Sequence, residues 1–286
     1  MNRRSFVLRQ PSLAVASLLG WWGMAAPAAA QGSFKLQIAT ALPPTPQGWS
    51  FLALADGDLA AVKRRGTNGK VEIHILEAGS NYQRFALQAE TPMAAVDDNV
   101  AFVALPNRDI AGITRNGASG HTELHVLDAG KGYKSYRRQL PTVLPPSDRR
   151  WSFGADGDGN LVGINRLGVS GKTEIHVVDA GKKYGSFRLQ TESALPATDL
   201  TWDFGVLANG DVVGINRRGE SGKTELHVLD AGKDYKRFRL QAPSPLTAAD
   251  DAWKFAVRGN GDVMAVLTRG AASGKTELHV FGSGKP

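Results

Sequence analysis

Tryptophan residues mark a fixed period along this chain. Trp151, Trp202 and Trp253 are spaced by 51 residues, Trp49 stands two periods before Trp151, and Val100 occupies the position between them. The surrounding sequence repeats in step: a Trp-x-Phe segment, a Gly-Asp turn, a Glu-Leu-His-Val run and a Tyr-x-x-Phe-x-Leu-Gln run. A fixed period of this length is typical of repeat architectures. The sequence therefore predicts one module used five times.

Each module contains four short apolar runs separated by Gly, Asn and Asp, a pattern that favours β-strands joined by hairpins. In the fourth module these runs are residues 202–206, 212–216, 223–229 and 238–241. Four antiparallel strands in each of five modules predict an all-β fold, a five-bladed β-propeller.

The last module lacks its fourth strand, because the chain stops soon after Phe281. The segment Ser33-Phe34-Lys35-Leu36-Gln37 matches the fourth strand of the third module, Ser186-Phe187-Arg188-Leu189-Gln190. Without a fourth strand the last blade would expose an unpaired edge. We therefore expect residues 33–37 to close the fifth blade.

Residues 1–30 are typical of an export signal. Arg3-Arg4 precedes an apolar stretch from Leu13 to Met24 and the small-residue pattern Ala28-Ala29-Ala30. The arginine pair resembles the twin-arginine motif. We expect cleavage after Ala30, a propeller domain over residues 31–286, no stable membrane insertion after cleavage, and a periplasmic or extracellular location in a bacterium.

The amino-acid composition excludes several kinds of functional site. The chain has no cysteine, so thiol catalysis, disulfides and cysteine metal sites are excluded. The formal charge is +7 and falls to +4 without Arg3, Arg4 and Arg9. Because the remaining charge is spread over every repeat, we expect no nucleic-acid partner. We also expect a monomer.

The repeat Lys-Thr-Glu-Leu-His-Val-Leu-Asp-Ala-Gly resembles the tandem repeats of FG-GAP/VCBS-type propellers, such as those found beside glycoside hydrolase domains. The plan of five blades is also similar to tachylectin-like sugar-binding propellers. The first resemblance implies calcium loops, yet segments such as Asp56-Gly57-Asp58 and Asp156-Gly157-Asp158 are too short to wrap a calcium ion. We interpret them as hairpin turns and expect no cofactor and no metal.

Ser170-Gly171-Lys172-Thr173 resembles the end of a phosphate-binding loop. That motif needs a glycine where Arg166 stands, and no helix follows. We interpret the segment as a hairpin loop.

A Glu-x-His pair recurs in the third strand of every blade, on one strand face. We favour a structural role, such as hydrogen bonds between adjacent blades, over five equivalent ligand sites, because every blade needs the former. The pairs are Glu72 and His74, Glu123 and His125, Glu174 and His176, Glu225 and His227, and Glu277 and His279.

Aromatic residues allow two interpretations. Trp49, Trp151, Trp202 and Trp253 can stack on sugar rings, but their place at the start of a strand favours packing. The tyrosines of the turn before the fourth strand are expected to be partly exposed; they are Tyr82, Tyr133, Tyr184 and Tyr235.

One rim of the propeller carries the best candidates for binding, because the loops after the second and fourth strands meet there. Basic residues gather in these loops and suit a polar or anionic ligand. They are Arg64, Lys70, Arg115, His121, Arg166, Lys172, Arg217, Lys223, Arg269 and Lys275.

Repetition and resemblance together favour an exported, non-enzymatic module that binds carbohydrate like a lectin at several sites. A periplasmic scaffold for protein partners is the alternative. A hydrolase with its site in the central channel is a third hypothesis, in which His121 is the main candidate because it replaces a lysine of the other blades.

Overall fold

The computed structural model describes residues 33–45 and 47–283. The chain divides into two units, Met1–Ala30 and Gln31–Pro286. The predicted export signal and its expected cleavage point lie outside the described residues. Within the described part of the chain, no helix has the length and apolar character needed to cross a membrane.

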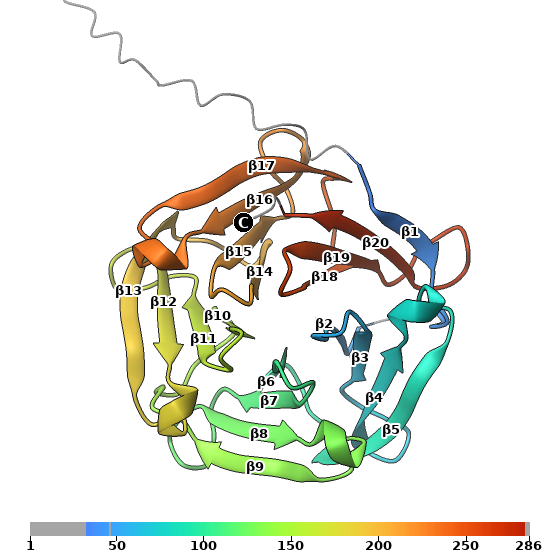
Figure 1. Cartoon of the computed structure of the whole chain (residues 1–286), viewed down its shortest axis with the longest axis horizontal. Coiled ribbons are helices and arrows are strands. Elements are labelled where there is room, and N and C mark those ends of the chain that lie inside the picture. The colour runs from blue at the N-terminus through green and yellow to red at the C-terminus, as the bar shows by residue number, and fades with distance from the viewer. Residues whose placement is uncertain (1–32, 46, 284–286) are drawn as a thin grey trace, which may run out of the picture. The chain divides into compact units, whose positions relative to one another are not determined.

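The second unit is a ring of five four-stranded antiparallel sheets, which confirms the predicted propeller (Figure 1). The strands nearest the centre are β2 (Trp49–Ala53), β6 (Val100–Ala104), β10 (Trp151–Ala155), β14 (Trp202–Val206) and β18 (Trp253–Val257). The second strands are β3 (Leu59–Lys63), β7 (Ile110–Thr114), β11 (Leu161–Asn165), β15 (Val212–Asn216) and β19 (Asp262–Leu267).

The outer half of each blade holds two further strands, which in the first four blades are joined through a short 3-10 turn. The third strands are β4 (Lys70–Leu76), β8 (Glu123–Leu127), β12 (Lys172–Val178), β16 (Lys223–Leu229) and β20 (Glu277–Gly282). The outermost strands are β5 (Phe85–Ala94), β9 (Tyr136–Pro141), β13 (Phe187–Pro196), β17 (Phe238–Thr247) and β1 (Leu36–Ala39). The 3-10 turns are η1 (Ala78–Ser80), η2 (Ala129–Lys131), η3 (Ala180–Lys182) and η4 (Ala231–Lys233).

The outermost strand of the fourth blade is longer than the sequence predicts. We expected the fourth strand of the fourth blade to end at Gln241, whereas β17 continues to Thr247 through two prolines. Proline is tolerated there because the edge of the sheet has no further strand to pair with.

The N-terminal strand closes the fifth blade. Strand β1 pairs antiparallel with β20, with Gln37 opposite His279, and the Lys35 amide donates to the Val280 carbonyl at 2.7 Å. Phe34 packs edge-on against Phe281. The expected closure is confirmed, although the paired strand runs from Leu36 to Ala39 and not over residues 33–37.

The hydrophobic core lies between the blades, because each blade packs one face on its neighbour. Ile73 and Ile75 of the first blade contact Phe102 and Ile110 of the second within one buried cluster. Burial of aliphatic and aromatic surface in five such interfaces is the main stabilising contribution in a chain without disulfides.

In each of the first four blades, hydrogen bonds from a tyrosine hydroxyl and to an Asp or Asn side chain join two turns. In the fourth blade, Asp211 accepts a hydrogen bond from the Ala231 amide at 2.8 Å, and the Tyr235 hydroxyl donates to the Gly210 carbonyl at 3.0 Å. Gly210 has φ of +89°, a conformation that glycine adopts without strain. The repeated tyrosines are therefore buried, with 2 to 5% exposure, and not partly exposed as expected.

Candidate functional site

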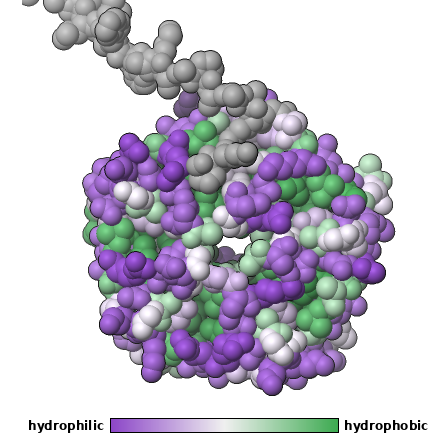
Figure 2. All heavy atoms as spheres, in the orientation of Figure 1, coloured by the Kyte–Doolittle hydropathy of each residue, from purple (hydrophilic) through white to green (hydrophobic). Residues whose placement is uncertain are grey.

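The inner strands surround a central channel, visible as a hollow in the middle of the ring (Figure 2). Phenylalanine recurs at the third position of every inner strand, and these rings border two cavities along the channel. They are Phe51, Phe102, Phe153, Phe204 and Phe255. The cavities differ in chemistry, so we describe each by itself.

The first, which we call the mouth cavity, has a volume of about 860 Å³ and opens where the inner strands begin. Its cationic lining residues are Lys63, Arg64, Arg65, Arg115, Arg149, Lys254 and Arg269, and its acidic ones are Asp97, Asp98, Asp203 and Asp251. Seven formal positive charges against four negative ones leave the lining at +3. A concave surface with this excess attracts anions.

The second cavity, which we call the apolar chamber, has a volume of about 530 Å³ and lies where the inner strands end. Leu52, Val103 and Val257 line it together with small residues such as Ala104 and Ala155. Asp156 and Arg258 are its only charged lining residues among the described ones.

Four arginines at the end of the second strand join each blade to the next. Arg166 is the most deeply buried, at 6% exposure; it donates through Nε to the Asp199 carbonyl at 3.1 Å and through Nη2 to the Trp202 carbonyl at 2.9 Å. Its guanidinium carbon lies 5.2 Å from the centre of the Phe204 ring. Equivalent cation–π contacts join Arg64 to Phe102, Arg115 to Phe153 and Arg217 to Phe255.

These contacts revise the interpretation of Arg64, Arg115, Arg166 and Arg217 as free rim residues. Their hydrogen bonds to backbone carbonyls of the following blade make them structural links. The sequence could not show this, because both partners of each link come from different repeats.

Arg115 also lines the mouth cavity, and one of its nitrogens has no hydrogen-bond partner within residues 33–45 and 47–283. Its Nε and Nη2 donate to the Asp148 and Trp151 carbonyls, at 2.9 and 3.0 Å. Its Nη1 is buried and has no hydrogen-bond partner in the described structure. Burial, together with the nearby charges of Arg64 and Arg166, lowers the pKa of Arg115 to about 10, so it stays charged at neutral pH. A buried donor without an acceptor is costly.

The fifth blade breaks the pattern of arginine links. Thr268 stands where the other blades have arginine, and its hydroxyl donates to the Ala252 carbonyl at 2.7 Å. Lys254 lies in the mouth cavity beside this position. Burial and the charge of Arg217 lower its pKa, partly offset by Asp203 and Asp251. In the described part of the chain, its ammonium group forms no hydrogen bond or ion pair.

Lys254 belongs to the channel position at which the blades differ most. The second residue of the inner strand is Ser50, Ala101, Ser152, Asp203 and Lys254 in chain order. Asp203 is neutralised by Arg217, whose Nε lies 2.6 Å from its carboxylate. A comparison of this position between the repeats points to Lys254. The candidates predicted from the sequence are instead residues that the blades share.

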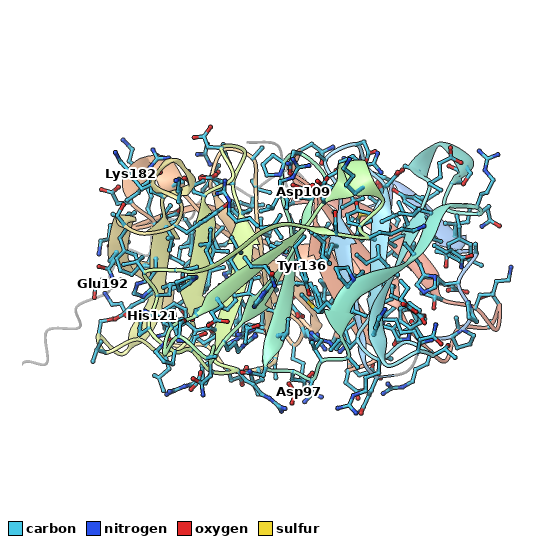
Figure 3. All side chains as sticks on the ribbon, turned by 90° about the horizontal axis from the view of Figure 1, so that it is seen from below. Asp97, Asp109, His121, Tyr136, Lys182 and Glu192 are labelled. Carbon is cyan, nitrogen blue, oxygen red and sulfur yellow. The ribbon has the colours of Figure 1, made fainter. Side chains whose placement is uncertain are left out.

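The ten basic rim candidates are not brought together. Figure 3 shows Asp97 and His121 at the same edge of the ring, opposite Asp109 and Lys182, so the two sets of loops do share one rim. Of the ten, the mouth cavity contains only Arg64, Arg115 and Arg269.

The other rim candidates lie outside the cavity. Lys70 and Lys172 form ion pairs with Glu90 and Glu192, at 2.7 and 3.2 Å. Lys223 and Lys275 are exposed. His121 is exposed, with its Nδ1 3.3 Å from the Leu144 carbonyl, and lines neither cavity, which corrects its assignment to the central channel.

The Glu-x-His pairs form a network inside each blade and not between blades, which corrects that expectation. In the third blade, the Gln190 amide lies 3.2 Å from His176 Nδ1, and Glu174 lies 3.7 Å from its Nε2. Burial lowers the pKa of His176 although Glu174 opposes this shift. A neutral ring that accepts at Nδ1 carries its proton on Nε2, and in His176 this buried nitrogen has no hydrogen-bond partner in the part of the chain that the structure describes.

Glu174 also fixes the loop before it, by accepting a hydrogen bond from the Ser170 amide at 3.1 Å. The same Glu–His–Gln arrangement recurs in the other blades. Among the described residues, no group of three or more His, Cys, Asp or Glu is arranged to hold a metal ion.

The repeated tryptophans pack within this network. The Trp151 ring lies 4.8 Å from that of His176 and stacks on Phe153. All four tryptophans are partly buried and pack against the clusters between blades, and Trp49 also borders the mouth cavity.

The rim of the third blade carries an exposed aliphatic patch. Leu167, Val169 and Leu200 are 49, 103 and 67% exposed. The corresponding positions of the other blades hold mostly polar or charged residues, for example Arg218 and Glu220 in the fourth. The Thr198 amide donates to the Arg166 carbonyl, so the two loops that carry the patch lie side by side.

Comparisons with known proteins assign no family to the chain. No known family profile and no curated protein matches the chain. Among solved structures, the chain is similar to puromycin hydrolase, with 18% identity over 80% of the chain and a TM-score of 0.41, and it spans only 35% of that protein.

Two carbohydrate-active propellers are similarly distant. An endo-arabinase from Bacteroides thetaiotaomicron matches with 14% identity over 86% of the chain and 97% of that protein, with a TM-score of 0.45. An exo-beta-1,3-galactanase from Phanerochaete chrysosporium matches with 11% identity over 86% of the chain and 64% of that protein, with a TM-score of 0.48. At such identities no catalytic or binding residue can be transferred.

Proposed function

We propose that this protein is an exported binding module whose mouth cavity holds an anionic ligand, most simply a carboxylated or sulfated glycan. The observation that carries the proposal is the excess of cations that lines the mouth cavity, among them Arg115 and Lys254. Charge-assisted hydrogen bonds between such cations and an anionic oxygen are the stronger kind.

Lys254 contributes the second cation. Because it carries no counter-ion of its own and is partly removed from water, an anion gains more from it than from a solvated lysine. Lys254 occurs in one blade only, so the proposal is one asymmetric site at the centre of the ring and not five equivalent sites.

A glycan array tests this proposal. The protein is expected to bind uronate-containing and sulfated glycans and not to bind their neutral counterparts. The variant Lys254→Met should weaken binding, whereas the matched rim variant Lys275→Met, which lies outside the cavity, should not. An array without signal on anionic glycans would overturn the proposal.

A protein partner is the second candidate, and the aliphatic patch of the third blade favours it. Exposed aliphatic side chains grouped on one surface mark interaction sites. An affinity pull-down from periplasmic extract, compared between the native protein and Val169→Asp, tests it. Loss of a captured protein, at an unchanged melting temperature, supports the scaffold; identical captured sets argue against it.

A further inference from the structure

The channel joins two environments of opposite chemistry. The same five phenylalanines border the cationic mouth cavity and the apolar chamber, so only one layer of aromatic rings lies between them. We infer that the ligand is an anionic amphiphile: its charged group occupies the mouth, and an acyl chain or aromatic ring extends past the phenylalanines into the chamber. This inference rests on the proposed function, which supplies the anion site.

The chamber has the size and lining of a site for an apolar group. Its volume of about 530 Å³ falls in the range of about 300 to 1,000 Å³ that is usual for small-molecule pockets. Leucine, valine, alanine and phenylalanine make up most of its lining. These apolar side chains offer no hydrogen-bond partner and suit contact with a hydrocarbon chain.

Small residues line the chamber at the ends of three inner strands, where a bulky side chain would fill space. Ala53, Ala104 and Ala155 occupy the last position of β2, β6 and β10, and each is only partly buried. Val206 and Val257 occupy the same position of β14 and β18. A larger side chain at one of the three alanines would occupy part of the chamber.

The phenylalanines lie at the level of the channel where the charged part and the apolar part of such a ligand would meet. Phe102 and Phe204 each carry a guanidinium over one face, from Arg64 and Arg166, at 5.3 and 5.2 Å. Their orientation is thereby fixed by charged groups of the preceding blade. A chain that passes this layer contacts ring surfaces that are already held in place.

Calorimetric titration with alkyl glucuronides tests the inference, at concentrations below those at which they form micelles. Octyl glucuronide should bind at least tenfold more tightly than methyl glucuronide, because each buried methylene contributes about 0.8 kcal/mol. In Ala155→Phe, which fills the chamber, this preference should fall to about twofold or less, while the affinity for methyl glucuronide stays unchanged. Ala104→Gln, which introduces an uncharged polar group into the chamber, should also reduce this preference, because the acyl chain would then lie against an amide.

The outcomes separate this inference from the proposed function. Equal affinity for the two glucuronides overturns the amphiphile and leaves the anion site standing. A preference for octyl that persists in both chamber variants, at unchanged melting temperature, also overturns it. If neither glucuronide binds but octyl glucoside binds more tightly than methyl glucoside, the anion site is wrong and the chamber remains supported.

Discussion

The guanidinium of Arg166 lies over the ring of Phe204 in the next blade and donates to the Trp202 carbonyl at 2.9 Å. This link joins the end of one blade to the inner strand of another. We expect Arg166→Met to lower the free energy of unfolding by about 2 kcal/mol, because hydrogen bonds from a charged donor are lost and the carbonyls remain buried. Chemical denaturation measures it. The nearby Lys172→Met is the control; equal stability of the two variants would contradict a linking role.

The closure of the ring depends on the N-terminal strand. A protein that begins at residue 38, and so lacks the pairing of Leu36 and Gln37 with β20, should melt several degrees below one that begins at residue 33. The comparison keeps all of the second, third and fourth blades intact. Superimposable melting curves would show that β1 contributes nothing to closure.

Protonation of the histidine network is expected to destabilise the fold. Burial lowers the pKa of His74, His125, His176, His227 and His279 in the folded protein. The unfolded chain takes up protons near pH 6.5, whereas the folded protein does so only at lower pH, so stability falls as pH decreases from 7 toward 5.

Melting temperatures at pH 7.5, 6 and 5 check this dependence. The carboxylates Glu72 and Glu123, whose pKa values are also lowered, lose their contribution only below about pH 4.5 and stay outside this window. His176→Gln should show a smaller decrease than the native protein. A melting temperature that is constant from pH 7.5 to 5 would rule out neutral histidines in the network.

The tyrosines of the 3-10 turns should matter through their hydroxyl groups. Tyr235→Phe removes the donor to the Gly210 carbonyl and leaves that oxygen buried, which costs about 1 kcal/mol. Tyr136→Phe, on the half-buried outer strand β9, is the matched control. A loss of stability no greater than that of the control would mean that the hydroxyl of Tyr235 is not needed.

The fold was largely predictable from the sequence because the same pattern of strands and turns occurs in five modules. Each strand boundary in the fourth module could be checked against four other copies, and the inner three strands begin and end where the sequence predicts. The outer strand extends past Gln241 because the edge of the sheet tolerates Pro243 and Pro245, which sequence patterns treat as strand ends.

The candidate site was predictable only in part, and for a related reason. Arg166 and Arg217 stand out in the sequence because they recur in the repeats. Their hydrogen-bond partners lie one repeat further along the chain, so their structural role is visible only in three dimensions. Lys254 and Asp203 occupy a position without a shared residue type. A site at the axis of a ring is built from what differs between the repeats.

The affinity for a charged ligand tests the central claim most directly. Calorimetric titration of the native protein with an oligogalacturonate should show binding that weakens with added salt, and Lys254→Met should reduce the affinity at least tenfold while its melting temperature stays at the native value or rises, since a partly buried charge is removed. Unchanged affinity in Lys254→Met, together with a loss in Lys275→Met, would place the ligand on the outer rim and contradict a site at the mouth of the channel.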